Sequence, residues 1–225
     1  MEIPLQKAVI RIITIEREYG CGAAGIAQEL AARLGWRLWD QLLTEEIARF
    51  AHCNQSEVKQ REERRDPLYY RLLKSFTLGS YEGNASVYPV ETLDADSIVK
   101  ISQRVVEQAA ASGNCVIVGR GSQHFLRARN DTLRFFLYGS KEQKVRRLIS
   151  EGQSETDAQV LVDTVDHERA AFIKKYFHAD WPNHSLYHAM VNTDTGNETV
   201  IGAILSFLQQ PRPTLLSTSA QRNAS

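Results

Sequence analysis

The feature that most constrains this chain is a β-branched run that leads through a glycine turn into an amphipathic helix. Residues 9–15 read VIRIITI, a pattern typical of a buried strand. The turn at 20–22 reads Gly-Cys-Gly, and from 23 to 34 apolar side chains recur at helical spacing until Gly35 ends the helix. A strand, a glycine turn and a helix in this order favour an α/β fold.

The same alternation of strands and helices continues along the chain. Further strands are predicted at 36–39, 115–118, 133–138 and 187–191. Helices are predicted at 94–111, from 141 onward behind a Ser140 cap, at 155–176 and at 197–208. This alternation implies a parallel sheet covered by helices on both faces, with ligands bound beyond the carboxyl ends of the strands.

Composition narrows the classes of partner. The chain has 225 residues, enough for one compact domain or at most two small ones, and its 27 basic residues balance its 27 acidic ones. No bulk attraction to nucleic acid or to an anionic membrane follows from that balance, so any bound anion must be held by a local cluster. No apolar run approaches the roughly 20 residues that span a bilayer.

The cysteines indicate the compartment. The three cysteines, Cys21, Cys53 and Cys115, are scattered and form no CxxC pair, which fits a reducing cytosol. We therefore expect a cytoplasmic protein without nucleic-acid or membrane partners. The sequence gives no indication of oligomeric state.

The glycine turn is the first candidate binding site. At the start of a helix, backbone N–H groups point at one spot, and the helix dipole adds roughly half a positive charge there. Glycine suits such a turn because the backbone visits positive φ and an anion lies against it. The turn therefore favours phosphate binding, with a tight turn that holds no ligand as the alternative.

Arginines form the second candidate set. Arg120 lies between two glycines after the strand at 115–118, where it could present a forked donor to a phosphate, or could be an ordinary surface arginine. Arg146, Arg147 and Arg169 lie on two adjacent predicted helices joined by a break at Gly152. Enzymes that transfer phosphoryl groups often bring arginines to the transferring oxygens on a closing lid. A solvated helix face is the alternative for these residues.

These segments resemble a known family. ITIEREYGCGAAGIAQELAARLG, WDQLLTEEIA, CVIVGRGSQHFL, LRFFLYGSKEQKVRRL, DHERAAFIKKYF and YHAMVNT occur in the order of the cytidylate kinase-like proteins, from about residue 9 to residue 208. The resemblance implies a P-loop NTPase-type three-layer α/β/α fold with a parallel sheet, an NMP-binding insertion and a helical lid. It also implies nucleotides as small-molecule ligands, with ATP and Mg²⁺ as cofactors.

The resemblance also divides the chain. One nucleoside monophosphate kinase-like domain would span 1–210, with a core at 8–40, 95–140 and 186–209. The NMP-binding segment would be 41–94 and the lid 141–185. Residues 211–225 would form a disordered tail.

Roles of individual residues follow from the resemblance. The donor phosphate would be bound by Tyr19, Gly20, Cys21, Gly22, Ala23, Ala24 and Gly25, with Arg17. The acceptor nucleotide would be contacted by Asp40, Arg120 and Gly121. The catalytic residues would be Arg17, Arg146, Arg147, Asp166 and Arg169, and no Mg²⁺ ligand is identified.

The loop departs from the usual pattern. In a full GxxxxGK[ST] loop a lysine reaches the β- and γ-phosphates and a hydroxyl holds Mg²⁺. Here Gly22 is followed by Ala23 and Ala24, and relatives usually carry an arginine where Ala24 stands. Arg17 is the expected substitute cation.

Three functions are therefore compatible with the sequence. The first is ATP-dependent phosphoryl transfer to a nucleoside monophosphate, with CMP or dCMP favoured by resemblance. The second is a catalytically weak or inactive nucleotide-binding sensor, and the third is a P-loop kinase of another small molecule.

Overall fold

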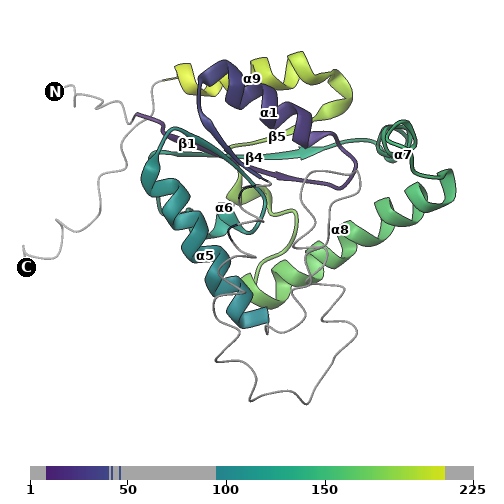
Figure 1. Ribbon diagram of the computed structural model, residues 1–225, viewed down its shortest axis with the longest axis horizontal. Coiled ribbons are helices and arrows are strands. Elements are labelled where there is room, and N and C mark those ends of the chain that lie inside the picture. Colours follow the sequence, from purple (N-terminus) through teal and green to yellow (C-terminus); the bar gives the residue numbers. More distant parts are fainter. Residues whose placement is uncertain (1–8, 41, 43–45, 47–94, 211–225) are drawn as a thin grey trace, which may run out of the picture.

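The computed structural model describes residues 9–40, 42, 46 and 95–210 (Figure 1). The predicted NMP-binding segment, apart from residues 42 and 46, and the predicted disordered tail lie outside these described residues. Those two predictions are therefore not tested by the structure.

The described residues form a five-stranded parallel sheet in the order β2-β3-β1-β4-β5. The strands are β1 (Ile12–Arg17), β2 (Arg37–Trp39), β3 (Cys115–Val118), β4 (Thr132–Tyr138) and β5 (Ala189–Asn192). β1 lies in the centre between β3 and β4, so the loop that follows it leaves the middle of the sheet.

Helices cover both faces of the sheet. One face carries α1 (Ala23–Leu34) and α9 (Asn197–Gln209), and the other carries α5 (Ala95–Ser112), α6 (Ser122–Phe125) and α8 (Glu155–Phe177) (Figure 1). Alternate residues of β1 point to opposite faces, so Ile13 and Ile15 pack with α1 and α9 while Ile12 packs with α5 and α8. The three-layer α/β/α architecture with a parallel sheet is confirmed.

A helical pair extends beyond the sheet. α7 (Lys141–Ser150) follows β4, and the Ser140 side chain caps it by accepting a hydrogen bond from the Gln143 N–H (3.4 Å). α7 packs on α8 through a small apolar cluster that contains Leu148, Val162 and Tyr19. Since Tyr19 belongs to the loop after β1, this cluster joins the predicted lid helices to the glycine turn.

The first strand is displaced from its predicted position. It begins at Ile12 rather than residue 9 and continues through Arg17, because its neighbours β3 and β4 begin opposite Ile12, at Cys115 and Thr132. Glu16 and Arg17, which follow the strand predicted at 9–15, pair in register with β4. The pairing fixes the direction of both side chains.

Short 3₁₀ turns flank the last strand. They are η1 (His184–Leu186) before β5 and η2 (Thr193–Thr195) after it. β5 itself starts two residues later than the predicted strand at 187–191.

Candidate active site

The loop after β1 has the backbone of an anion-binding turn. Gly20 and Gly22 both adopt φ +78°, the left-handed conformation that glycine tolerates best. Gly22 is the N-cap of α1, which begins at Ala23 as predicted, and neither a side-chain cap nor a first-turn acidic residue is present among the described residues. The first N–H groups of α1 have no acceptor within the helix, so they are available to an anion.

Cys21 contributes only its backbone to this loop. Its side chain is fully buried, and the thiol points at the Leu137 carbonyl oxygen of β4 (3.6 Å). The loop is thereby fastened to the sheet by the residue between its two glycines.

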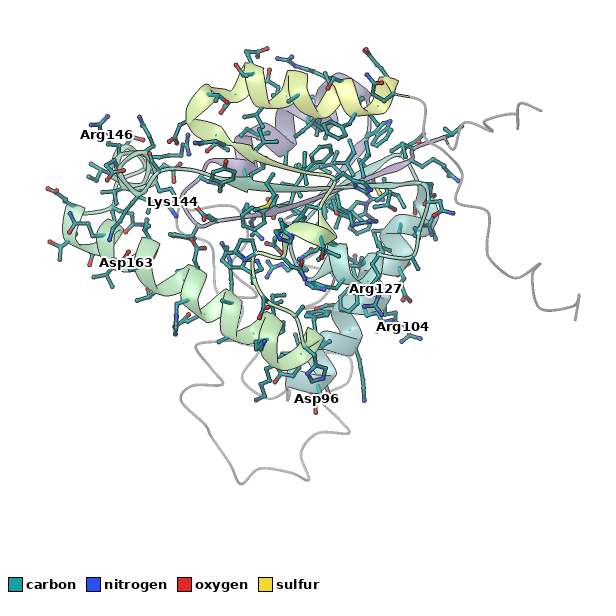
Figure 2. All side chains as sticks on the ribbon, turned by 180° about the vertical axis from the view of Figure 1, so that it is seen from behind. Asp96, Arg104, Arg127, Lys144, Arg146 and Asp163 are labelled. Carbon is teal, nitrogen blue, oxygen red and sulfur yellow. The ribbon has the colours of Figure 1, made fainter. Side chains whose placement is uncertain are left out.

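Arg147 of α7 lies directly on the loop. Its Nη1 donates to the Gly20 carbonyl oxygen (3.0 Å), and its Cζ lies 2.5 Å from the position that a Cβ on Gly22 would occupy. Arg146 is exposed, and Figure 2 places it on the outer side of α7. Of the two predicted lid arginines on this helix, the structure brings Arg147 to the loop.

Lys144, one turn earlier on α7, is held by two carboxylates. Its Nζ lies 2.8 Å from Glu18 Oε2 and 3.5 Å from Asp166 Oδ2, and the residue is only 7% exposed. Burial opposes its charge, but the hydrogen bond to Glu18 and the charge of Asp166 outweigh it and raise the pKa of Lys144.

Asp166 connects α8 to the loop that follows β1. One carboxylate oxygen, Oδ1, accepts from the Tyr19 backbone N–H (2.8 Å) and from Arg169 Nη1 (3.2 Å). Burial raises the pKa of Asp166, while Arg169, the Tyr19 N–H and Lys144 act to lower it. This predicted catalytic residue therefore serves as an anchor between α8 and the loop.

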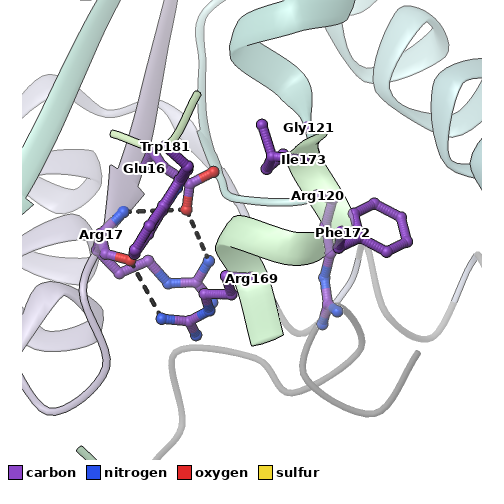
Figure 3. Close-up of a pocket in the computed structure, with 8 residues that line it drawn as sticks. All are labelled: Glu16, Arg17, Arg120, Gly121, Arg169, Phe172, Ile173 and Trp181. Atoms are coloured by element: carbon purple, nitrogen blue, oxygen red, sulfur yellow. Dashed lines mark hydrogen bonds and ion pairs between the residues drawn. The ribbon is translucent and has the colours of Figure 1, made fainter. Parts of the chain in front are cut away.

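A pocket opens beyond the carboxyl ends of β1 and β3. Its volume is about 310 Å³, including space open to solvent. Figure 3 shows the eight residues that line it, which are Glu16, Arg17, Arg120, Gly121, Arg169, Phe172, Ile173 and Trp181. Charged groups and aromatic rings thus share one recess, at the edge of the sheet where the sequence predicts ligand binding.

Three buried arginines from three different elements meet at this pocket. Arg17 ends β1, Arg120 follows β3 and Arg169 comes from α8, and they are 5%, 3% and 6% exposed. Burial and then the neighbouring Arg17 charge lower the pKa of Arg120 to about 9, and the same two causes lower the pKa of Arg169. Like charges held this close favour an anion between them.

The backbone after β3 directs Arg120 into the pocket. Gly119, Arg120 and Gly121 have φ of +65°, +61° and +72° in succession. For a residue with a Cβ this conformation costs roughly 1–2 kcal/mol, and such strain concentrates at functional sites. The glycines also leave room, because the Arg17 guanidinium lies where a Cβ on Gly119 would stand.

Two carboxylates balance part of this charge. Glu16 Oε1 lies 3.6 Å from Arg17 Nη1, and Glu16 Oε2 accepts a hydrogen bond from Gln123 Nε2 (2.5 Å). Asp40, predicted to contact the acceptor, directly follows β2 and is 5% exposed, and its charge favours the charged form of Arg120. The pocket lining itself retains an excess of positive charge.

Sequence reasoning missed Glu16, Phe172, Ile173 and Trp181. Glu16 could have been predicted as a site residue, since a carboxylate that directly follows a buried β-branched run falls at a strand end. Trp181 could not have been predicted, because it lies in the irregular segment after α8, where no periodic pattern predicts which way a side chain faces.

The structure separates the predicted cations into two groups. Arg17, Arg120 and Arg169 surround the pocket, whereas Arg147 lies on the glycine loop. Arg17, expected to serve the loop, lies instead against Gly119.

The loop fits a nucleotide phosphate, but metal ligands are not evident. Across residues 9–40, 42, 46 and 95–210, no three His, Cys, Asp or Glu side chains are grouped so that they could hold a metal ion. Mg²⁺ in kinases takes many of its ligands from water and from the phosphates themselves. We therefore assign no Mg²⁺ ligand.

Comparison with known protein families shows to which family this chain belongs. The profile of the cytidylate kinase-like family matches residues 12–195. The chain belongs to the cytidylate kinase-like family. That match contains β1, the glycine loop, the residues that line the arginine pocket, α7 and α8. Comparison with curated proteins finds no match.

Solved structures share the fold of this family member. An uncharacterized protein from Eubacterium ventriosum is 22% identical, with a TM-score of 0.62, covering 89% of this chain and 98% of that one. Shikimate kinase from Acinetobacter baumannii, solved with shikimate, is 14% identical with a TM-score of 0.50, covering 90% and 94%. The P-loop kinase fold is thereby confirmed.

In the part of the chain that the structure describes, no helix is both long enough and apolar enough to cross a membrane.

Proposed function

We propose that this protein transfers the γ-phosphoryl group of ATP to a nucleoside monophosphate, with CMP or dCMP as the favoured acceptor. Membership of a cytidylate kinase-like family and the P-loop kinase fold support phosphoryl transfer in general. The observation that carries the proposal is the convergence of Arg17, Arg120 and Arg169, all buried, on one pocket next to the glycine loop.

Each group has a task in this reaction. The backbone N–H groups at the start of α1 would hold the donor β-phosphate, while Arg17 and Arg120 would hold the acceptor phosphate. Arg169 lies between these two sites, because its Nη1 donates both to the Arg17 carbonyl oxygen (3.1 Å) and to Asp166, which binds the loop. It would stabilise negative charge as the phosphoryl group moves, so that positioning and electrostatics supply the catalysis.

The cofactor adds charge neutralisation. Mg²⁺ bound with ATP would offset the charge of the β- and γ-phosphates. The arginines of the pocket would act on the acceptor side, where their mutual repulsion falls once a phosphate lies among them.

A coupled ADP-release assay with all common nucleoside monophosphates tests this proposal. We expect turnover that depends on the acceptor and is fastest with CMP or dCMP. Absence of acceptor-dependent turnover with every nucleotide would refute nucleoside monophosphate kinase activity. Turnover with a different small molecule would favour the broader class of P-loop kinases.

One observation favours a second candidate, a nucleotide-binding protein without turnover. The first helical positions after the loop are Ala23 and Ala24, so residues 20–25 carry neither a lysine nor a hydroxyl. Loss of one oxyanion donor commonly costs about 100-fold or more in rate. Calorimetry that shows ADP binding without dependence on Mg²⁺, together with no turnover, would support this candidate.

A further inference from the structure

The glycine loop carries no cation of its own. Residues 20–25 read GCGAAG, so neither the loop nor the first turn of α1 contributes a basic side chain. The β- and γ-phosphates of a bound nucleotide carry several negative charges, and kinases of this fold meet them with a cation beside the loop. If the proposed function holds, another element must supply that cation.

Arg147 has the position that this task requires. Its guanidinium lies closer to Gly22 than any other side chain, with Cζ, Nη1 and Nε at 2.5, 2.7 and 2.8 Å from the Cβ position of that glycine. Its hydrogen bond to the Gly20 carbonyl oxygen fixes it there. The second of the two loop glycines therefore makes room for a cation that arrives from α7.

Neighbouring cations are less suited. Lys144 approaches Gly20 with its stem, but its ammonium group is already held between Glu18 and Asp166. Arg17 packs on Gly119 and lines the arginine pocket instead.

We infer that Arg147 replaces the missing loop lysine and binds the β-phosphate of the donor nucleotide. The guanidinium needs only one of its donors for Gly20, and a planar fork has further donors to offer to phosphate oxygens. This inference rests on the proposed function, and it assigns the cation that binds the donor phosphate to a different structural element. The cation belongs to α7 rather than to the loop, so tight binding of the donor requires α7 to be docked on the loop.

Calorimetric titration of ADP and AMP into the full-length protein tests the inference without relying on turnover. R147Q removes the charge but keeps a polar side chain. We expect it to bind ADP at least about tenfold more weakly, as for the loss of a charge-assisted hydrogen bond. AMP, which lacks a β-phosphate, should change by no more than about twofold. K141Q, a loss of charge at an exposed ion pair on the same helix, should bind ADP like the wild type.

The outcomes separate the two proposals. An R147Q protein that binds ADP like the wild type, or that loses ADP and AMP equally, would overturn the role of Arg147 alone. A wild-type protein that binds no ADP would overturn this inference and the proposed function together. Thermal unfolding of each variant shows whether it is folded. If R147Q unfolds below the assay temperature, R147M becomes the test, since it keeps an unbranched side chain but removes every donor, and it must bind ADP at least about tenfold more weakly while AMP changes by no more than about twofold.

Discussion

Gly121 offers a sharp test of how the arginine pocket is built. An alanine there would adopt φ near +72°, and its Cβ would lie 2.5 Å from Cζ of the Phe177 ring. That ring cannot move easily, because it is stacked on His124 (centroids 4.4 Å apart) and meets Phe125 edge-on (5.2 Å). Gly121→Ala therefore adds overpacking to an unfavourable backbone conformation.

The two contributions can be separated with a second glycine. Gly35 has φ +64° and nothing within 4 Å of its Cβ position, so Gly35→Ala carries the backbone cost alone. That cost is roughly 1–2 kcal/mol, and overpacking adds about 1–3 kcal/mol. We expect Gly121→Ala to lose about 2–5 kcal/mol of unfolding free energy and Gly35→Ala only about 1–2 kcal/mol.

Thermal unfolding followed by circular dichroism measures the difference. For a chain of this size 1 kcal/mol shifts Tm by about 2–4 °C. The Tm of Gly121→Ala should therefore lie about 2–12 °C below that of Gly35→Ala. Equal Tm values for the two variants would refute the claim that the Phe177 ring is fixed against this turn. Because Arg120 directly precedes Gly121, only Gly121→Ala should also raise the KM for the acceptor.

Three further predictions concern the ionisable groups Arg169, Lys144 and Cys115. Arg169→Ala should lower kcat at least about 100-fold in the ADP-release assay, and an unchanged kcat would remove Arg169 from the reaction. Lys144→Met leaves two carboxylates without their cation and should cost about 1–3 kcal/mol by denaturant unfolding, against less than about 1 kcal/mol for Lys141→Met. The stabilisation from Lys144 has its full value below the pKa of an unfolded lysine and is lost as pH rises through the raised pKa of Lys144 in the folded protein. The difference in unfolding free energy between Lys144→Met and wild type should therefore become smaller in strong alkali. Burial raises the pKa of Cys115 to about 11. In a variant with the other two cysteines replaced by serine, the rate of alkylation of Cys115 should be slow at pH 8 and rise steeply toward pH 11. Fast alkylation at pH 8 would contradict the burial of this thiol.

The fold was predictable because its signals are local. α1 has the predicted ends, and β3 has the predicted residues, since glycine turns bound both elements. The start of β1 could not be predicted, because the β-branched run at 9–15 is continuous and only the pairing with β3 and β4 decides where the strand begins. Val9, at the start of that run, is 72% exposed.

The candidate site was predictable in residue type but not in direction. The glycine spacing singled out Arg120, and the family resemblance singled out Asp40 and Asp166. The sequence could not show that Arg17 turns toward Gly119 while Arg147 turns toward Gly22, since both facts depend on how α7, α8 and the sheet pack. Arg146 and Arg147 are adjacent in sequence, so helix geometry points them about 100° apart, but only the cluster around Leu148 and Tyr19 determines which of them faces the loop.

The packing of α8 links the two phosphate sites that we propose. Asp166 and Arg169 are one turn apart on α8; the first accepts from the Tyr19 N–H of the loop, and the second donates to the carbonyl oxygen of Arg17 while its guanidinium faces the pocket. Any rotation or shift of α8 must therefore change the geometry of the loop and of the arginine pocket together. A kinase needs such a link, because transfer requires the donor and acceptor phosphates to be aligned at the same moment.

Asp166→Asn tests this link between the two sites, since the amide keeps an acceptor for the Tyr19 N–H but loses the charge that holds Arg169. If the link exists, this variant should weaken the binding of acceptor and donor nucleotides alike, whereas loss at only one of the two sites would show that α8 serves them independently.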